Sequence, residues 1–455
     1  MEEEKYQRLA NFFAKVNIAF AALLLCYLYF NLDGIYMARI FKLPLQIYGW
    51  TSLLGGVLLY RKAFGAFISL GFLNMLLIGA EFVAYIIICF STNEIQWEGF
   101  NRPASTYDPI AGYLWDNNDS TRIMRLAKGH VIYDQTFKPN NKGYISKTPY
   151  QFKKTDKKRY LLFGDSFSCA EFLETPISDR LNQFATNDSL NIEFYSFAQD
   201  GAGLANWHSI YFNEIKKNYE FDGIILASWF DNWQREFSVL HMTPDGGYFS
   251  RANGIKGPLA EVLPEITKQH NNIWSIASNQ EMDNMKADKD KKQLFVLQPW
   301  NLYFIKKTTK AVERFYLDLK KFGKQSATKE NKLVCNEEYL MEKFGGSTLR
   351  KWEEIIQDAI QMDKEVIITS IPRKMWANPS KFQERKKEKV YHQLELEYYA
   401  NKYQLPYIDG YKPFHHLEID DFMTHWLKYD GHWNQKGSDL FANYFYQNFK
   451  EDLNE

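Results

Sequence analysis

The chain has 455 residues, enough for one large or two ordinary domains with attached segments. Its 55 basic and 55 acidic side chains balance, so overall charge gives no reason to expect nucleic acid or an acidic polymer as a partner. The four cysteines lack metal-like spacing, which excludes a zinc site and a disulfide scaffold and leaves open whether Cys169 and Cys335 pair. The sequence therefore implies no metal and no cofactor.

Three long apolar runs set the first ninety residues apart from the rest. They cover residues 16–32, 43–60 and 64–90, each about as long as a helix needs to cross a membrane. Basic residues precede the first run and fill the turn between the second and third: Lys5, Arg8, Lys15, Arg61 and Lys62. The positive-inside rule places these on the cytoplasmic side, although Arg39 and Lys42 lie in the other loop. We therefore expect three transmembrane helices within 1–90 and an exported remainder.

Glu81 and Asn74 interrupt the third apolar run. An ionisable residue at membrane depth is by default a candidate functional site, but near the outer end it could equally snorkel or face the other two helices. The role of Glu81 stays open.

Residues 91–157 are polar and rich in turn signals. Short β-prone pieces lie between the turns, for example HVIYD at 130–134 and GYISK at 143–147. This pattern predicts small strands packed as a lead-in rather than a flexible linker.

From residue 158 onward, strand and helix patterns alternate. The expected strands are 159–164, 191–198, 222–229, 365–372 and 406–411, and the expected helices are 177–186, 204–218, 349–361, 381–403 and 434–453. Such alternation predicts a parallel sheet with helices on its faces. It breaks at 234–345, where Gly, Asn and Lys clusters surround one helical pattern at 302–322. These residues predict an insertion of helices and loops over the carboxyl edge of the sheet.

Polar residues follow several of the predicted strands. Gly164-Asp165-Ser166 ends the first, Gly201 follows the second, Asp231-Asn232 follows the third, and Asp430-Gly431-His432 precedes the last helix. Open α/β sheets bind ligands at the carboxyl ends of their strands. All four groups can therefore converge on one edge of one sheet.

These residue types fit nucleophilic catalysis. A serine nucleophile needs a base, an acid that orients the base, and N–H donors aimed at the developing oxyanion. Ser166, His432 and Asp430 supply the nucleophile, the base and the acid. A spacing of two residues lets the Asp430 carboxylate reach Nδ1 of the imidazole. The backbone N–H groups of Ser166 and Gly201, with the side-chain amide of Asn232, could supply the donors.

The four groups resemble the blocks of SGNH (GDSL-type) hydrolases, which carry a Ser, a Gly, an Asn and a His in this chain order. The match covers residues 159 to about 450, and DGHWNQKG at 430–437 is its most specific part. PNNKGY at 139–144 also resembles exported, membrane-anchored members. The resemblance implies a three-layer, flavodoxin-like α/β hydrolase domain at 158–455.

The third block departs from the family order, which usually reads Asn-Asp. With Asp231-Asn232 here, either the loop shifts by one so that Asn232 points inward, or Asp231 takes the donor's place and the oxyanion hole lacks its side-chain donor. Loss of one such donor typically costs about 10²- to 10³-fold in rate. The family's acid often lies three residues before the histidine, where Tyr429 stands, so Asp430 must act from two before.

The resemblance implies a membrane-anchored serine esterase that removes acyl groups, acetyl being the expected one, from a cell-envelope glycan or lipid. The expected location is a bacterial inner membrane, with the soluble part on the periplasmic or extracellular side. One alternative is an O-acyltransferase on an envelope polysaccharide that acts with a membrane-bound acyltransferase. Another is a non-catalytic glycan-binding module, which Asp231 favours and the complete Ser-His-Asp set argues against.

Overall fold

A computed structural model of the chain describes residues 92–235, 237–244, 246–252, 272–294, 335–374 and 389–452, with parts of 8–23 and 50–61 and Val83. Most of the three apolar runs, Glu81 and the helical pattern at 302–322 lie outside these residues. Within the part that is described, no helix has both the length and the apolar character needed to cross a bilayer. The chain divides into two units, 1–93 with 292–331, and 94–291 with 332–455. All residues of the predicted site belong to the second.

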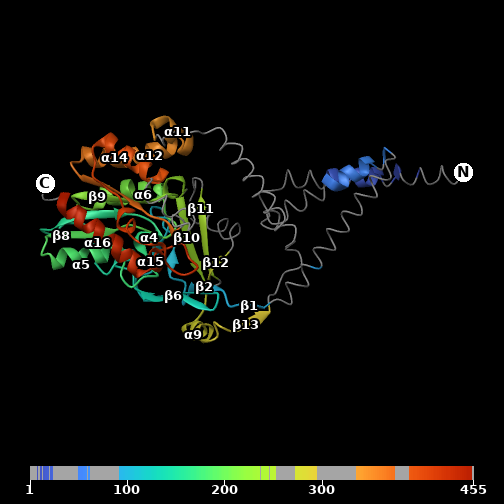
Figure 1. Cartoon of the computed structure of the whole chain (residues 1–455), viewed down its shortest axis with the longest axis horizontal. Helices are drawn as coiled ribbons and strands as arrows, with labels where there is room; N and C mark the ends of the chain where they lie inside the picture. Colours follow the sequence, from blue (N-terminus) through green and yellow to red (C-terminus); the bar gives the residue numbers. More distant parts are fainter. Residues whose placement is uncertain are drawn as a thin grey trace. The chain divides into compact units, whose positions relative to one another are not determined.

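Five parallel strands form the central sheet of the second unit, in the order β15-β14-β9-β7-β8 (Figure 1). They are β7 (Lys158–Phe163), β8 (Ile192–Ser196), β9 (Gly223–Trp229), β14 (Glu365–Ile371) and β15 (Tyr407–Ile408). Counted from β7, this is the 2-1-3-4-5 order of flavodoxin-like folds, in which ligands bind beside the first and third strands. The predicted parallel sheet is confirmed, and β7 and β9 flank its switch point.

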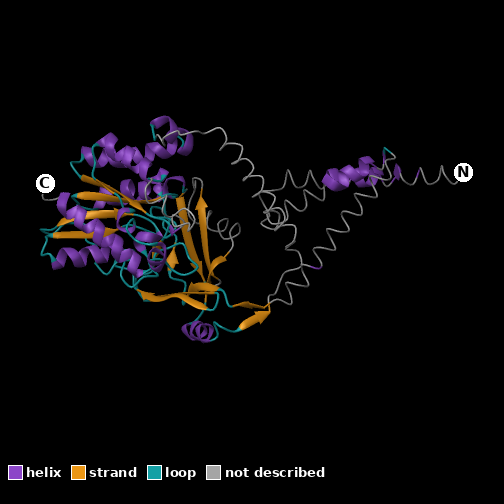
Figure 2. Ribbon diagram, in the orientation of Figure 1, coloured by secondary structure: helices purple, strands orange, loops and turns teal. Residues whose placement is uncertain are grey.

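Helices cover both faces of this sheet (Figure 2). The described helices of the domain are α4 (Ser166–Cys169), α5 (Ile177–Asn187), α6 (Leu204–Ile210), the π-helix η1 (Tyr211–Ile215), α7 (Lys216–Asn218), α11 (Glu337–Phe344), α12 (Gly346–Gln361), α14 (Tyr391–Tyr403), α15 (Ile419–Thr424) and α16 (Gln435–Asp452). Alternate residues of β7 enter different cores, because successive side chains of a strand point to opposite faces. Leu162 packs in the core that contains residues of α5 and α16, whereas Leu161 packs with residues of α6, α12 and α14.

A second sheet has six strands in the order β10-β11-β12-β2-β5-β6. They are β2 (Trp97–Phe100), β5 (Thr121–Ala127), β6 (His130–Phe137), β10 (Phe237–Thr243), β11 (Gly246–Ala252) and β12 (Asn272–Ile276). Only the β12–β2 pair is parallel. Three strands thus come from the lead-in and three from the insertion.

The prediction of helices and loops alone for residues 234–345 is therefore wrong in part. The described residues of that segment contain β10–β12, the helix α9 (Asn279–Ala287) and the helix α11. The Asp-Gly pair at 245–246 lies between two β-prone runs and is a strong hairpin signal. The surrounding Gly, Asn and Lys clusters are typical of loops, so the hairpin was not predicted. Short paired strands are also β1 (Thr92–Glu94) with β13 (Lys292–Leu294), and β3 (Ser105–Thr106) with β4 (Leu114–Trp115).

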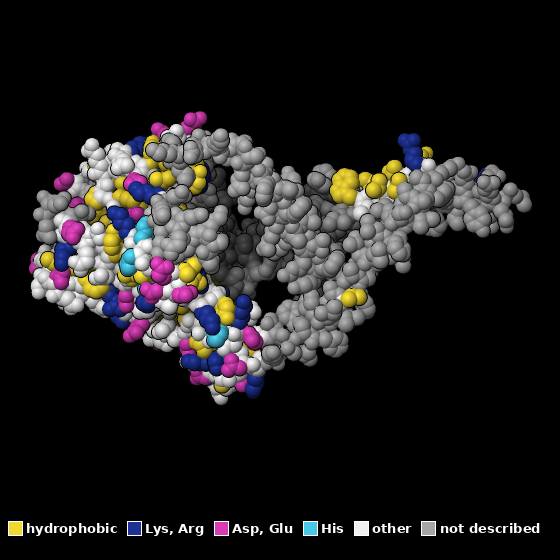
Figure 3. Space-filling model, viewed as in Figure 1, with side chains coloured by type: hydrophobic (Ala, Val, Ile, Leu, Met, Phe, Trp, Pro, Cys, Tyr) yellow, Lys and Arg dark blue, Asp and Glu magenta, His cyan; other side chains and the backbone are white. Residues whose placement is uncertain are grey.

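A further predicted element differs from the structure. Residues 143–147 form bends rather than a strand, because the Asp179 carboxylate accepts hydrogen bonds from Ser146 Oγ and Lys147 N and takes the place of a partner strand. Of the helix expected at 381–403, residues 381–388 lie outside the described residues, and the described helix α14 begins at Tyr391, where Gln393 Oε1 accepts the Val390 N–H. On the face shown in Figure 3, cationic and anionic side chains of the described residues are interspersed.

Candidate active site

Ser166 lies at the carboxyl end of β7, in the first turn of the short helix α4. Asp165 caps that helix by accepting the Phe167 N–H at its Oδ1, at 3.1 Å. A Cβ at Gly164 would stand 2.2 Å from Ser168 Oγ, so only glycine allows the turn between strand and helix to be this tight. The turn therefore places the serine hydroxyl at the switch point of the sheet.

The structure brings Ser166, His432 and Asp430 together. Ser166 Oγ lies 2.8 Å from His432 Nε2, and His432 Nδ1 lies 2.6 Å from Asp430 Oδ1. Asp430 Oδ1 also accepts the backbone N–H of His432 at 2.7 Å, which fixes the carboxylate against the base that it orients. The His432 side chain is 30% exposed and that of Asp430 only 5%, so the imidazole is partly exposed while its partner is shielded.

The charges around His432 prepare it to accept a proton. Burial alone would lower the pKa of His432, but the hydrogen bond and charge of Asp430, with the charges of Asp200 and Asp165, raise it above its usual value. Burial would raise the pKa of Asp430, yet its bonds to His432 and the charge of Arg125 hold it well below its usual range. The pair therefore favours a carboxylate next to an imidazole that is easily protonated.

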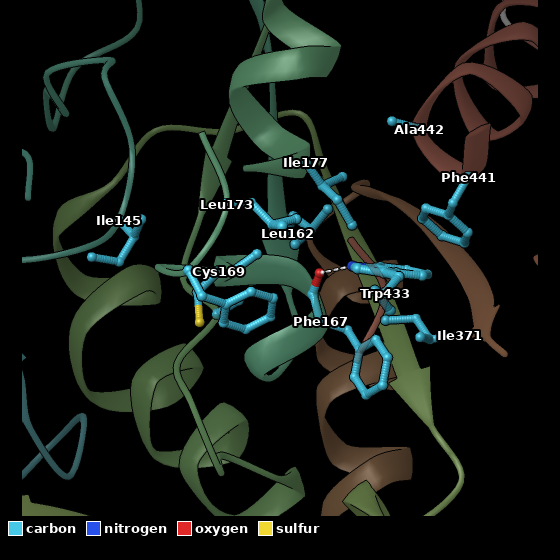
Figure 4. Close-up of a cluster of buried hydrophobic side chains, with 14 of the residues drawn as sticks. Ile145, Leu162, Phe167, Cys169, Leu173, Ile177, Ile371, Trp433, Phe441 and Ala442 are labelled. Carbon is cyan, nitrogen blue, oxygen red and sulfur yellow. Dashed lines mark hydrogen bonds between the residues drawn. The ribbon is translucent and has the colours of Figure 1, made fainter. Parts of the chain in front are cut away.

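Aromatic side chains link two segments of the site. One is the turn at 164–166, the serine turn, and the other is the loop between α15 and α16 that carries His432. Trp433 Nε1 donates to the Phe167 carbonyl at 3.1 Å, inside the buried apolar cluster shown in Figure 4. The rings of Phe167 and Phe172 lie 4.8 and 5.1 Å from the His432 ring. These contacts restrict how far the imidazole can rotate away from Ser166.

Asn232 faces inward but does not lie free for a substrate. Its Nδ2 donates to Asp165 Oδ2 at 2.9 Å and to the Ala202 carbonyl at 3.2 Å, and its Oδ1 accepts the Trp229 N–H. The Asn232 amide thus has acceptors within the protein, and its donation to an oxyanion stays a prediction. The sequence assigned the Asp165 carboxylate no role, so this partner of Asn232 was not foreseen.

Arg235 shares the partners of Asn232. Its Nη1 donates to Asp165 Oδ2 and to the Ala202 carbonyl, both at 3.0 Å, while its Nε lies 3.4 Å from Asp231 Oδ2. The Asp231 side chain is one-third exposed. Arg235 therefore neutralises the carboxylates of Asp165 and Asp231, a contact that the sequence did not predict.

Two backbone N–H groups remain as candidate oxyanion donors. Gly201 follows β8 with a φ of +68°, a conformation that glycine adopts without strain. Within the described residues, no acceptor bonds to the N–H groups of Ser166 or Gly201. These are the two backbone donors that the sequence predicted.

Two acids, the buried Glu171 and the half-buried Asp200, lie in the electrostatic surroundings of His432. Burial and the charge of Asp200 raise the pKa of Glu171 to about 8, and burial also raises the pKa of Asp200. Glu171 Oε2 accepts from Cys169 Sγ at 3.2 Å. Cys169 and Cys335 are both free thiols, so the two cysteines do not pair.

Arg125 of β5 is a further residue of the site that the sequence gave no reason to select. Its Nη1 forms an ion pair with Asp430 Oδ2, the oxygen that His432 leaves unused, and lies 3.5 Å from Glu98 Oε2. Burial would lower the pKa of Arg125, but the charges of Glu98 and Asp430 raise it. The second sheet thus contacts the acid of the predicted triad.

No family model and no curated protein matches the sequence. Among solved structures, the chain is similar to a GDSL-like lipase from Bacteroides thetaiotaomicron, with 11% identity, 65% of this chain and 89% of that one covered, and a TM-score of 0.28. It is also similar to a lipase/acylhydrolase from Enterococcus faecalis (15%, 65% and 96%, TM-score 0.31) and to a psychrotrophic esterase from Pseudoalteromonas sp. (8%, 66% and 100%, TM-score 0.31). At this level of similarity, the function has to be inferred from the residues of the site.

Proposed function

We propose that the chain is a serine ester hydrolase of the SGNH type that acts outside the cytoplasm from a membrane anchor. The observation that carries the proposal is the continuous hydrogen-bonded series from Ser166 Oγ through His432 to Asp430 at the carboxyl edge of a flavodoxin-like sheet. A nucleophile, a base and an orienting acid within hydrogen-bond reach are the parts that acyl transfer requires.

Acylation uses these parts in order. Ser166 Oγ attacks the ester carbonyl carbon while its proton passes to His432 Nε2, and the carbonyl oxygen becomes an oxyanion near the Ser166 and Gly201 N–H groups. The Asp430 carboxylate stabilises the imidazolium ion. When the carbonyl reforms, His432 returns the proton to the leaving alkoxide, so an alcohol departs and an acyl ester remains on Ser166.

Deacylation repeats these steps with a second nucleophile. Water gives its proton to His432 Nε2 as its oxygen attacks the acyl carbon, and the collapse releases a carboxylic acid and restores the Ser166 hydroxyl. A sugar hydroxyl in place of water would give a new ester and make the chain an O-acyltransferase. The triad serves both reactions, so analysis of the products distinguishes them.

We further propose that the substrate is an acyl ester, acetyl above all, on a cell-envelope glycan or lipid. Two partly exposed aromatic residues support a glycan, Trp229 at the end of β9 and Phe230 beside it. The Trp229 ring stacks 5.5 Å from Phe167, next to the nucleophile, where a sugar ring could pack. The apolar N-terminus supports a site held near a membrane surface.

The test uses the full chain in detergent, with p-nitrophenyl acetate as substrate and a fluorophosphonate as a covalent probe of the serine. We expect release of p-nitrophenol and a single labelled site at Ser166 in the wild type, and neither in Ser166→Ala. If the wild-type chain binds acetylated glycan but neither hydrolyses p-nitrophenyl acetate nor reacts with the fluorophosphonate, it is instead a glycan-binding module.

The location has its own test. The cations at Lys5, Arg8, Arg61 and Lys62, combined with three apolar runs, support residues 91–455 on the outer side of the membrane. Protease added to spheroplasts should digest the C-terminal domain and spare a tag at the N-terminus. The opposite pattern of protection would reverse the proposed topology.

A further inference from the structure

We propose that Arg125 is a positioning residue for the reaction: by holding Asp430, it fixes the orientation of His432 and limits the basicity of its imidazole. The inference rests on the proposed function, since it concerns the same triad. It assigns to the second sheet a direct contribution to the active site.

Asp430 has two carboxylate oxygens with different partners. Oδ1 accepts both the ring Nδ1–H and the backbone N–H of His432, whereas Oδ2 pairs with Arg125 Nη1. Because the Asp430 side chain is only 5% exposed, water contributes little to the solvation of its charge. The Arg125 guanidinium is therefore the main counter-charge on the side of Asp430 that faces away from the base.

The sheet places this guanidinium through strand register. Arg125 on β5 stands directly opposite Glu98 on β2 and Tyr133 on β6, and directly opposed residues point to the same face. Tyr133 Oη donates to Glu98 Oε1 at 2.6 Å, and Glu98 Oε2 lies 3.5 Å from Arg125 Nη1. The row Glu98–Arg125–Tyr133 thus spans three strands and holds the arginine toward Asp430.

The loop that carries Asp430 needs such a support. It runs from α15 to α16 as turns and a single bridge between Trp426 and Trp433, and Tyr429 adopts a φ of +62°, which is uncommon for a residue with a side chain. Lys374 Nζ donates to the Leu427 and Asp430 carbonyls, at 2.6 and 2.8 Å. These bonds hold the backbone of the loop, whereas Arg125 holds its carboxylate.

Other titratable groups lie around the Asp430–His432 pair and contribute to its electrostatic surroundings in every Arg125 variant. They are Glu98 on β2, Tyr133 on β6, Lys374 after β14, and Asp165, Glu171 and Asp200 near the serine turn. Arg125 is the cation paired directly with the Asp430 carboxylate in the part of the chain that the structure describes. Its removal should therefore raise the proton affinity of His432, because a nearby positive charge disfavours the imidazolium.

The decisive variants are Arg125→Ala and Arg125→Lys in the full chain, with Arg122→Ala as the matched control. Arg122 lies on the same strand but pairs with Asp134 and Asp283, away from the triad. We expect Arg125→Ala to lower kcat for p-nitrophenyl acetate by about 10- to 100-fold with KM changed less than about twofold, the scale typical of losing a partner that orients a reactive group. Arg125→Lys should recover part of the lost rate, and Arg122→Ala should retain the wild-type rate.

A second measurement separates positioning from mere support of the fold. The rate of Ser166 labelling by the fluorophosphonate, followed against pH, should show its acid limb moved to higher pH in Arg125→Ala and unmoved in Arg125→Lys. A folded Arg125→Ala chain with the wild-type kcat and acid limb would overturn the proposal while leaving the esterase intact. If the wild type neither labels nor turns over, the proposed function fails, and the pKa of His432 measured by NMR then decides: a value unchanged in Arg125→Ala overturns the role of Arg125.

Discussion

The two sheets of the domain differ in how they are built and in what they contribute to the site. The parallel sheet alternates with its helices along the chain, and the turns after its strands carry Ser166 and Gly201. The second sheet contains β2, β5 and β6, which precede Ser166 in the sequence, and β10–β12, which follow it. The first therefore carries the proposed nucleophile and Gly201, and the second carries Arg125, a counter-charge for Asp430 in the loop between α15 and α16.

The largest effect should come from the proposed nucleophile and base. Ser166→Ala and His432→Ala should each lower kcat on the order of 10⁴- to 10⁶-fold, and the double variant should be no slower than the worse single one, because the two act as a unit. The check is turnover of p-nitrophenyl acetate beside a melting curve. Substantial activity in either folded variant would remove that residue from the triad.

The next effect tests a contact between the two sheets. Arg235 lies just before β10, and its guanidinium is paired with the buried carboxylate of Asp165, which caps the serine helix. Asp165→Ala would leave Arg235 buried without this partner, so we expect a loss of about 3 to 5 kcal/mol in the free energy of unfolding. Denaturant titration measures it.

Asp188→Ala is the matched control for this loss. Asp188 pairs with Lys450 at the surface, where solvent screens the ion pair, so its removal should cost far less stability than that of Asp165. An Asp165→Ala chain as stable as Asp188→Ala would show that the Asp165–Arg235 pair does not join the sheets.

Much of the parallel sheet could be predicted because its information is local. Each strand is a short apolar run, Ser166 follows one of them, and Asp430 and His432 stand two residues apart before the last helix, so all three could be selected from local sequence patterns. The direction of the Asn232 amide could not, because it depends on Asp165, 67 residues earlier. Arg125 lies 305 residues from Asp430 in a strand without any motif, and only the pairing of β5 with β2 and β6 aims it at the acid.

A smaller effect should appear in the pH dependence of the rate. The base must be neutral to accept the serine proton, and the pKa of His432 is raised above its usual value by Asp430, despite its burial. On the acid side, kcat/KM should therefore rise about tenfold per pH unit and level off around a midpoint above pH 6.5. A limb at or below pH 6.5 in the wild type would mean that Asp430 does not favour the imidazolium as the geometry indicates.

The smallest effect concerns stability near the nucleophile, where the parallel sheet's side of the site holds a buried acid. Burial and the charge of Asp200 raise the pKa of Glu171 to about 8, so the folded chain binds a proton that the unfolded chain releases near pH 4.5. Folding therefore takes up a proton between these values, and the stability from Glu171 is lost as pH rises from about 4.5 to about 8. Glu171→Gln keeps the neutral, hydrogen-bonding shape without this proton, so its Tm should fall less than that of the wild type between pH 6 and 8.5, by a few °C. An equal change of Tm with pH in the two chains across this range would show that Glu171 is ionised in the fold at neutral pH, where its negative charge would join that of Asp430 in favouring the protonated form of His432.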